Sequence, residues 1–261
     1  MIYDTLLSAK PPDNSLIGRG EYNFSIKKGL LTSGTFYEIG SGLEPKKEFS
    51  FLQVAPGQGV YIYGGDYNVN GVKDLNEFEV AAFANEADYI KEYTPTDQYE
   101  KTYTNQFSQV LNFKPLAVWN NRKGARGFIS RLSNQTAYRA DRKSKDKNLG
   151  KSYNPFLKEP DDSLLVSLTS SLRNTIYFNQ NSNIIGIDYT YSDNRAKTLL
   201  TNGFDSRINT YHESRTRWNI IRKWTLLFYY KEGTKKNRNE FFSTKDYSIA
   251  YSELQPKISF Q

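Results

Sequence analysis

The sequence is poor in the residues that most often carry covalent or metal chemistry. Its 261 residues include no cysteine, one histidine and one methionine. The absence of cysteine excludes a disulfide scaffold, a thiolate metal site and a cysteine nucleophile. A single histidine excludes a multi-histidine metal site. No apolar run approaches the roughly 18 residues that a membrane-spanning helix needs.

Aromatic residues and charges are, by contrast, abundant. The chain has 20 tyrosines, 16 phenylalanines and 3 tryptophans, a content typical of a folded chain rather than a disordered one. The formal net charge is +7, but the densest basic cluster, at 139–158, is interleaved with acidic and amide residues. We therefore interpret this cluster as a solvated loop and expect no nucleic-acid partner.

The first part of the chain predicts a small β-region over residues 1–65. Residues 1–20 lack a basic segment followed by an apolar one, so they contain no secretory signal peptide. This predicts either a cytosolic protein or a part of a longer chain. Strand-like runs then alternate with glycine, proline and lysine at the spacing of β-hairpins. These runs lie at 22–26, 35–39, 49–54 and 59–63.

The sharpest local motif is DYNVNGVKDLNE at 66–77, which fits the calcium-loop pattern D-x-[DN]-x-[DN]-G-x5-E at each specified position. Gly71 stands where the loop turns sharply, and the last position of the pattern supplies a bidentate carboxylate. Calcium binds six to eight oxygen ligands, and this spacing supplies them. The predicted ligands of a structural Ca²⁺ are Asp66, Asn68, Asn70, the carbonyl of Val72, Asp74 and Glu77. The alternative is a metal-free turn rich in Asn and Gly.

The flanks of this motif differ from those of a paired calcium sensor. The segment 59–63 alternates as a strand, so no helix enters the loop. After the loop, 75–89 places its apolar residues along one helical stripe. We therefore expect a strand–loop–helix unit within 66–104, in which a calcium ion would fix the approach of the strand to the helix.

From residue 105 to 261 the dominant pattern is alternation with period two, typical of β-strands. Between 205 and 220, for example, all five charged residues occupy odd positions. The stretches of alternation reach about 16 residues, whereas strands of soluble proteins usually have about 3–10. Seven strands are expected, at 106–118, 126–140, 163–178, 184–196, 205–219, 223–236 and 245–260.

The strand length and the connections favour an outer-membrane-type barrel. Long connections at 142–162, 195–204 and 233–244 alternate with short ones at 180–183 and 221–223, as in barrels with tight turns on one side. Aromatic residues near strand ends suit interfacial girdles; these are Phe178, Trp218, Trp224 and Phe260. The charged face would then line or plug a passage through Arg173, Asp188, Arg207, Glu213, Arg215 and Arg217.

Seven strands do not make a complete barrel. Single-chain bacterial barrels have an even number of strands from eight upward, and an open edge is not tolerated in lipid. Other chains or missing segments are therefore expected to close it, with outer-membrane lipid as the surrounding partner. The alternative from the same alternation is a soluble antiparallel β-sandwich.

Short segments spread along the chain form a recognisable combination. They are GSGLEPKKEF at 40–49, PGQGVY at 56–61, DYNVNG at 66–71, LNEFE at 75–79, DYTY at 188–191 and LTNGF at 200–204. Together they resemble large, poorly characterised outer-membrane or cell-surface proteins of the Bacteroidota. In such proteins a β-region with a DxNxNG loop precedes a large barrel. The resemblance implies a location and an architecture, and it implies no settled activity.

No combination of residues predicts catalysis. The one histidine, His212, is expected on the less polar face of its strand, where no carboxylate stands to complete a triad. Asp161 and Asp162 are adjacent in a loop, so their side chains diverge, whereas acid–base catalysis needs two converging carboxyl groups.

The sequence thus predicts a mainly β chain that is not an enzyme. We expect an outer-membrane barrel segment, preceded by a small β-region and a calcium loop, that serves transport, translocation or surface assembly. The alternative function is a soluble, calcium-stabilised β-sandwich for adhesion or glycan binding.

Overall fold

A computed structural model describes the chain over 14–67, 69–74, 77–120, 122–157, 164–200, 203–221, 223–239 and 246–260. The protein is mainly β and divides into two compact units. The larger unit comprises Ser15–Gly42, Thr102–Leu199 and Phe204–Gln261, and the smaller one is centred on Leu43–Lys101. This division differs from the expected boundaries at 65 and 104, because the first hairpin of the chain belongs to the larger unit.

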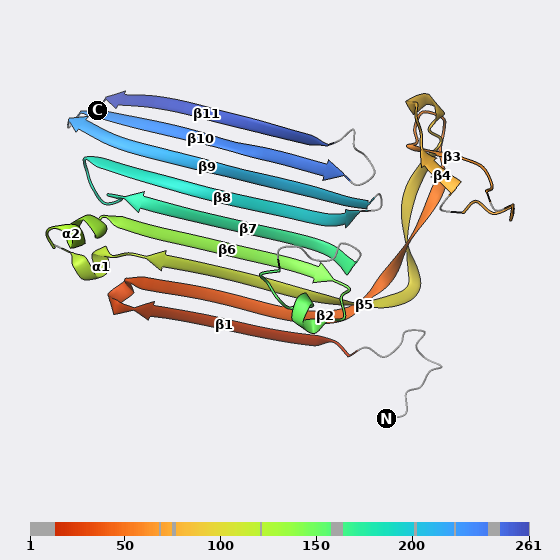
Figure 1. The fold of residues 1–261 in the computed structure, drawn as a ribbon, viewed down its shortest axis with the longest axis horizontal. Helices are drawn as coiled ribbons and strands as arrows, with labels where there is room; N and C mark the ends of the chain where they lie inside the picture. The colour runs from red at the N-terminus through yellow and green to blue at the C-terminus, as the bar shows by residue number, and fades with distance from the viewer. Residues whose placement is uncertain are drawn as a thin grey trace. The chain divides into compact units, whose positions relative to one another are not determined.

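The larger unit is a single antiparallel sheet in which each strand pairs with the next one along the path (Figure 1). Its long antiparallel strands confirm the mainly β character expected from the alternation, and over the described residues the sheet does not close into a barrel. In spatial order they are β1 (Leu16–Ile26), β2 (Leu31–Gln53), β5 (Tyr89–Phe113), β6 (Leu132–Ser144), β7 (Leu165–Phe178), β8 (Ile185–Leu200), β9 (Gly203–Ile221), β10 (Trp224–Asn239) and β11 (Tyr247–Phe260). Strands β2 and β5 also extend into the smaller unit.

We call the end of the sheet where β1, β5, β7, β9 and β11 finish the turn end, and the opposite one the loop end. At the turn end lie η1 (Lys27–Gly29), the helices α1 (Leu116–Trp119) and α2 (Ala125–Ile129), and the connections 179–184 and 222–223. At the loop end lie residues 145–157, which contain α3 (Leu149–Ser152). Residues 201–202, which follow β8, and 240–245, which follow β10, lie outside the described residues.

The expected alternation of short and long connections is therefore only partly correct. Strands β8 and β9 continue to Leu200 and from Gly203, so the connection expected at 195–204 shrinks to two residues. On the turn side, the ends of two expected strands instead form α1 and α2. The ends of β8 and β9 next to this connection are mostly polar. Polar residues that pair in a hairpin cannot be told from loop residues by sequence alone.

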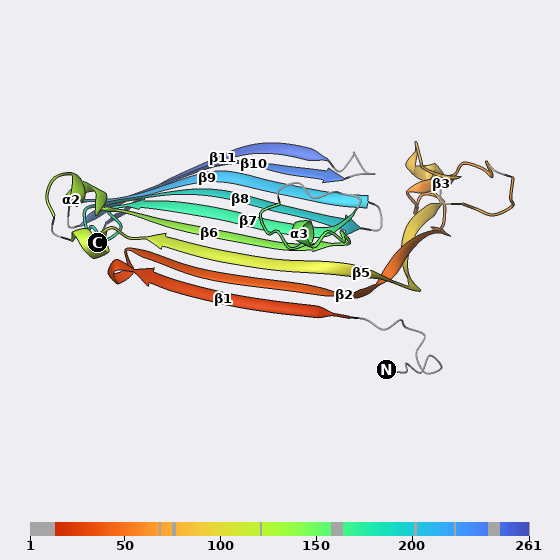
Figure 2. The ribbon, with the colours of Figure 1, turned by 60° about the horizontal axis from the view of Figure 1, so that its bottom comes forward.

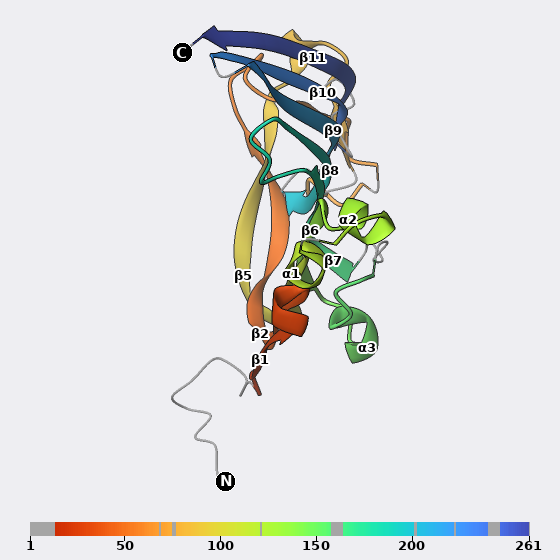
Figure 3. The ribbon, with the colours of Figure 1, turned by 90° about the vertical axis from the view of Figure 1, so that its left-hand side faces the viewer.

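The sheet has two chemically different faces. Side chains alternate along a strand, and directly opposed residues of antiparallel strands share a face. One row across β9, β10 and β11 consists of Arg217, Leu227 and Lys257. The next row, on the other side, consists of Trp218, Leu226 and Ile258. We call these sides the polar face and the apolar face; Figures 2 and 3 show the strands between them as one curved layer.

Much of this layer is open to its surroundings. Among the described residues only seven apolar side chains are buried: Tyr61, Ala87, Tyr89, Phe107, Pro115, Ala140 and Leu165. The accessible surface is 17796 Å², whereas a folded monomer of 30.1 kDa has about 12,000 Å². The excess is typical of an open single layer rather than of a compact fold.

One part of the apolar face is covered by the chain itself. Residues 145–157, which we call the clasp, fold back over this face at the loop end. The Arg142 guanidinium donates to the carbonyl of Ser152 at 2.8 Å, and Asn105 Nδ2 donates to the same oxygen at 2.5 Å. Phe156 packs edge-on against Phe107, with ring centroids 5.0 Å apart. The clasp thus covers the apolar face over β5 and β6 at the loop end, whereas apolar residues at the turn end, such as Trp218 and Trp224, are exposed.

The smaller unit contains β3 (Tyr61–Tyr63), β4 (Phe78–Val80), η3 (Ala84–Glu86) and the adjoining parts of β2 and β5. Strand β4 pairs antiparallel with β3, with Tyr61 opposite Val80. Phe78 stacks on Phe51 at 3.9 Å and lies 5.0 Å from the ring of Tyr89. An aromatic cluster therefore forms the core of this unit.

The helix expected over 75–89 is wrong. Where residues of this range are described they form β4, η3 and the start of β5. Pairing with β3 satisfies the backbone of β4 and brings Phe78 into the aromatic cluster, and this tertiary gain outweighs the weak local preference for helix. Phe83, which the helical stripe would have buried, is 64% exposed.

Candidate functional site

The loop 66–77 is held closed by its own acidic side chains. The Asp66 carboxylate accepts hydrogen bonds from the backbone amides of Asn70, at 3.1 Å, and Gly71, at 2.7 Å. Gly71 has φ +73°, the left-handed conformation that favours glycine and that the sharp turn of the motif requires. The first and sixth positions of the pattern therefore adopt the local arrangement that the sequence predicts.

Glu77, the expected bidentate ligand, is fully buried. Its carboxylate accepts the amides of Tyr67 and Asp74, each at 2.9 Å, and the hydroxyl of Tyr63 at 3.4 Å. A buried carboxylate is stable only when it is hydrogen-bonded or paired. These three donors let Glu77 tie the two ends of the loop together.

The other expected ligands are arranged around this carboxylate. Asn70 Nδ2 donates to Asp74 at 2.9 Å, and Asn70 Oδ1 accepts the amide of Val72 at 2.7 Å. Asn68 lies outside the described residues. Over the part of the chain that the structure describes, no three acidic or histidine side chains converge as a metal-holding group. The loop therefore gathers the predicted ligands without bringing their oxygens to one point.

The electrostatics of the loop are concentrated on Tyr63. Burial raises the pKa of its phenol, and the neighbouring carboxylates of Glu77, Asp66 and Asp74 raise it further because they oppose a phenolate. Three carboxylates thus act on one hydroxyl. Such a concentration of negative charge favours a bound cation.

Sequence reasoning missed Lys73, which lies inside the loop. Its ammonium donates to the Tyr89 hydroxyl at 2.6 Å and lies 5.0 Å from the ring centre of Tyr63. The contact combines a hydrogen bond with cation–π attraction. It ties the loop to the aromatic core of the smaller unit, and no sequence motif marks it, because Tyr89 is sixteen residues away.

In the larger unit, the six charged residues expected to line a passage all lie on the polar face. They are Arg173, Asp188, Arg207, Glu213, Arg215 and Arg217. Glu213 is buried, pairs with Arg215 and accepts the Tyr229 hydroxyl at 3.4 Å. Asp188 lies within the electrostatic reach of Arg215 and Arg217. Four of these charges therefore act on one another or on a shared neighbour, whereas Arg207 pairs with Asp205.

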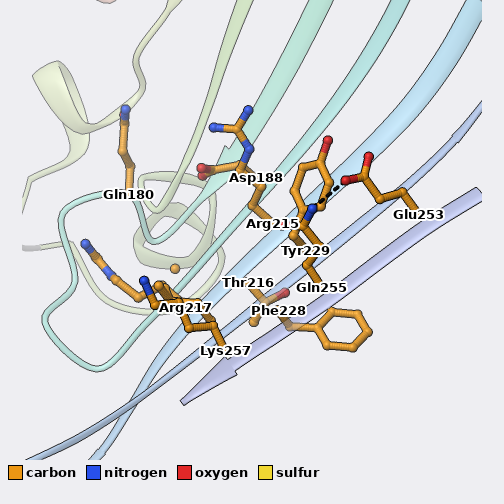
Figure 4. Close-up of a pocket in the computed structure, with 12 residues that line it drawn as sticks. Gln180, Asp188, Arg215, Thr216, Arg217, Phe228, Tyr229, Glu253, Gln255 and Lys257 are labelled. Atoms are coloured by element: carbon orange, nitrogen blue, oxygen red, sulfur yellow. Dashed lines mark hydrogen bonds between the residues drawn. The ribbon is translucent and has the colours of Figure 1, made fainter. Parts of the chain in front are cut away.

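The polar face is hollowed over β8–β11. A cavity of about 690 Å³ is lined by Gln180, Gly186, Asp188, Arg215, Thr216, Arg217, Leu227, Phe228, Tyr229, Glu253, Gln255 and Lys257 (Figure 4). Arg217 and Lys257 flank Leu227 in one row, and the carboxylate of Asp188 points toward Arg215. Sequence reasoning missed Glu253, Gln255 and Lys257, because their placement depends on the β10–β11 register, which no local pattern fixes.

The turn end of the apolar face carries four aromatic side chains, of which Trp218, Trp224 and Phe260 are exposed and Phe178 is half-buried. Phe178, Trp218 and Phe260 lie in the last four residues of their strands, and Trp224 is the first residue of β10. Trp224 and Phe260 are directly opposed, with ring centroids 5.0 Å apart. The residues expected to form an aromatic girdle are thus brought to one end of the sheet.

His212 lies on the apolar face as expected. The Tyr189 hydroxyl lies 2.6 Å from its Nδ1, and the ring of Tyr191 lies 5.0 Å away. Glu232 is directly opposed to His212 on β10, so the expectation that no carboxylate shares this face is wrong: the β9–β10 register brings Glu232 there.

No protein-family model, curated protein or solved structure matches the chain. Among the described residues, no helix combines the length and the apolar character needed to cross a membrane.

Proposed function

We propose that the larger unit is a segment of an outer-membrane β-barrel, which serves transport, translocation or surface assembly and performs no catalysis. One observation carries the proposal: the sheet is a single layer with a bare apolar face and a charged opposite face. A lipid-facing exterior and a wet lumen require this division. The resemblance to Bacteroidota surface proteins supports the same location.

The dimensions of the bare apolar band agree with this proposal. On β8, β10 and β11, every apolar-face residue is aliphatic, aromatic or proline over Ile185–Tyr191, Trp224–Tyr230 and Leu254–Phe260. Each segment has seven residues and extends about 23 Å along its strand. The apolar band of membrane barrels is roughly 25 Å tall. Beyond the band, Asp193 and Glu232 begin a polar stretch toward the loop end, outside the proposed lipid zone.

Polar side chains on the apolar face of β6 and β7 are paired with one another. Asn134 Nδ2 donates to Asn174 Oδ1 at 3.2 Å, and Asn174 Nδ2 donates to Thr136 at 2.7 Å. Polar groups in hydrocarbon must be satisfied internally. Because these side chains bond to one another, they are compatible with a lipid-facing surface, whereas polar side chains without a partner would not be.

The smaller unit would be stabilised by a calcium ion in the loop 66–77. Its donor set of carboxylate, amide and backbone oxygens is the chemistry that Ca²⁺ prefers. Asp66, Asn70, Asp74 and Glu77 with the Val72 carbonyl and Asn68 would hold the ion. The turn at Gly71, closed by the Asp66 carboxylate, is the structural observation that supports this assignment.

The decisive experiment is fractionation of the native gene product, followed by gel mobility of unheated and boiled samples in mild detergent. A barrel should sediment with the outer membrane and run differently before and after boiling. A product that stays soluble without detergent and shows no mobility difference contradicts the proposal. That outcome would favour a calcium-stabilised β-sandwich for adhesion or glycan binding.

A further inference from the structure

The two outer strands of the sheet run in the same direction. Nine described strands follow one another along the antiparallel path, and β1 and β11 are its first and last members. Each antiparallel step reverses the direction of the chain, so an odd number of strands leaves both edges parallel. Figure 1 shows β1 and β11 pointing toward the same end.

Both edges are open over their described length. Strand β11 is exposed at nearly every position, and β1 likewise. The apolar band continues undiminished to the β11 edge, where Leu254 is 58%, Ile258 66% and Phe260 61% exposed. An edge strand with free backbone groups is a template for pairing, and in lipid such an edge must be closed.

The sheet cannot close antiparallel on itself. A direct β1–β11 contact would join two strands of the same direction. Two copies in the same membrane orientation meet the same obstacle, because β11 of one copy also runs parallel to β1 of the next. Antiparallel closure at both edges requires an odd number of additional strands between β11 and β1.

We propose that the partner of these edges is a β-segment outside 14–260 that contributes an odd number of antiparallel strands. This inference rests on the proposed membrane barrel. The strand beside β11 should carry apolar side chains facing outward, opposite Leu254 and Ile258. Facing inward it should carry charges opposite in sign to Glu253 and Lys257, because directly opposed residues interact most strongly. Pro256 has no backbone N–H to donate, so the pairing of β11 with this strand loses at most one hydrogen bond at that residue.

Residues 1–261 contain no cysteine, so cysteines introduced here are the only thiols in this part of the chain. The full native product is prepared with Leu254→Cys combined in turn with Tyr22→Cys, Phe24→Cys and Ile26→Cys, which lie on the apolar face of β1. The matched control is Tyr230→Cys with Leu254→Cys, because these residues are direct partners on β10 and β11. Mild oxidation should link the control pair and none of the β1–β11 pairs. A disulfide between β1 and β11, within one chain or between copies, overturns the proposal.

A second readout gives the direction of the partner. Single cysteines at Ser252, Leu254 and Ile258 are cross-linked with a short bifunctional reagent, and the linked residues are identified by mass spectrometry. The linked residues should lie outside 14–260. Their residue numbers should decrease as the number of the β11 cysteine increases, because an antiparallel neighbour runs in the opposite direction. Rising positions, or no link while the control pair forms, overturn the proposal.

Failure of this inference can be told apart from failure of the proposed function. A heat-modifiable outer-membrane protein with a β1–β11 disulfide would still be a barrel, closed directly by a parallel pair. A soluble product without heat-dependent mobility would overturn the barrel itself, and with it the reason for a closing segment.

Discussion

Arg142 on β6 donates to the carbonyl of Ser152 in the clasp at 2.8 Å, and the same nitrogen donates to the carbonyls of Lys151 and Asn154. One buried guanidinium thus satisfies the carbonyls that end the short helix α3. This side chain holds the clasp on the sheet. It therefore also determines which part of the apolar face the clasp covers.

Replacing Arg142 should release the clasp. Arg142→Met keeps most of the volume but removes the charged donor that the three carbonyls share. Ser152 then keeps only the Asn105 amide, and Lys151 and Asn154 keep only backbone amides. The free energy of unfolding should therefore fall by about 2 kcal/mol. Proteolysis should then cut within 145–157. The control is Arg139→Met, because Arg139 is exposed on the polar face and pairs only with Asp141 among the described residues. Its effect should stay within about 0.5 kcal/mol. Equal effects of the two variants would contradict this role.

Phe228 and Leu227 offer a matched test of the two faces. They are neighbours on β10, they are 40% and 38% exposed, and they lie on opposite faces. In a membrane barrel, Phe228→Arg should cost about 2–4 kcal/mol and block insertion, whereas Leu227→Arg should be tolerated in a wet lumen. Folding into lipid vesicles measures both. Ile187→Arg, on the apolar face of β8, should behave as Phe228→Arg does. Equal tolerance of Phe228→Arg and Leu227→Arg would contradict a lipid-facing side.

Calcium should stabilise the smaller unit. At a hundredfold excess over the dissociation constant, binding contributes about 2.7 kcal/mol, which appears as a rise in Tm. The double variant Asp66→Ala, Glu77→Ala should abolish the rise. Glu79→Gln is the control, because its carboxylate contacts the Tyr67 hydroxyl and stands outside the ligand pattern. If the native protein shows no rise in Tm with calcium, the loop is a metal-free turn.

The phenol of Tyr63 should report on the same site. Its raised pKa means that the folded protein keeps this proton above pH 10, where the unfolded chain loses it. The associated stability is therefore complete below pH 10 and is lost as the pH rises through the raised value. Calcium should lower this pKa by neutralising the carboxylates. The tyrosinate absorbance of the native protein minus that of Tyr63→Phe, with and without calcium, measures the change. A calcium-independent difference would contradict the assignment.

The strands of the larger unit were predictable because alternation is a local signal. In β9, charges at odd positions from Asp205 to Arg217 mark one face, and the structure places them together. The aromatic residues expected near strand ends also lie near strand ends, at the turn end. Strand ends could be predicted because the alternation of polar and apolar residues stops there.

Contacts between distant segments could not be predicted in this way. The sequence around Phe78 fits a helical stripe, and only the stacking on Phe51 explains why it forms β4 instead. The burial of Arg142 depends on the clasp folding back, and the cavity residues Glu253 and Lys257 depend on register. Of the calcium ligands, the local hydrogen bonds of Asp66 follow from the motif, whereas the Lys73–Tyr89 contact joins residues that no pattern relates.

The pairing of β2 with β5 has a consequence for the order of folding. Thr102 Oγ1 donates to the carbonyl of Gly42 at 3.4 Å across sixty residues of chain, whereas β8–β9 and β9–β10 are joined by two-residue connections. Closing a loop costs about 0.6 kcal/mol more for each doubling of its length, and non-local pairing is slow. The hairpins of β7–β11 should therefore form first. If the smaller unit folds early around its aromatic cluster, it shortens the effective loop between β2 and β5. A ligand that speeds the folding of this unit would then also speed the pairing of the β1–β2 hairpin with the rest of the sheet.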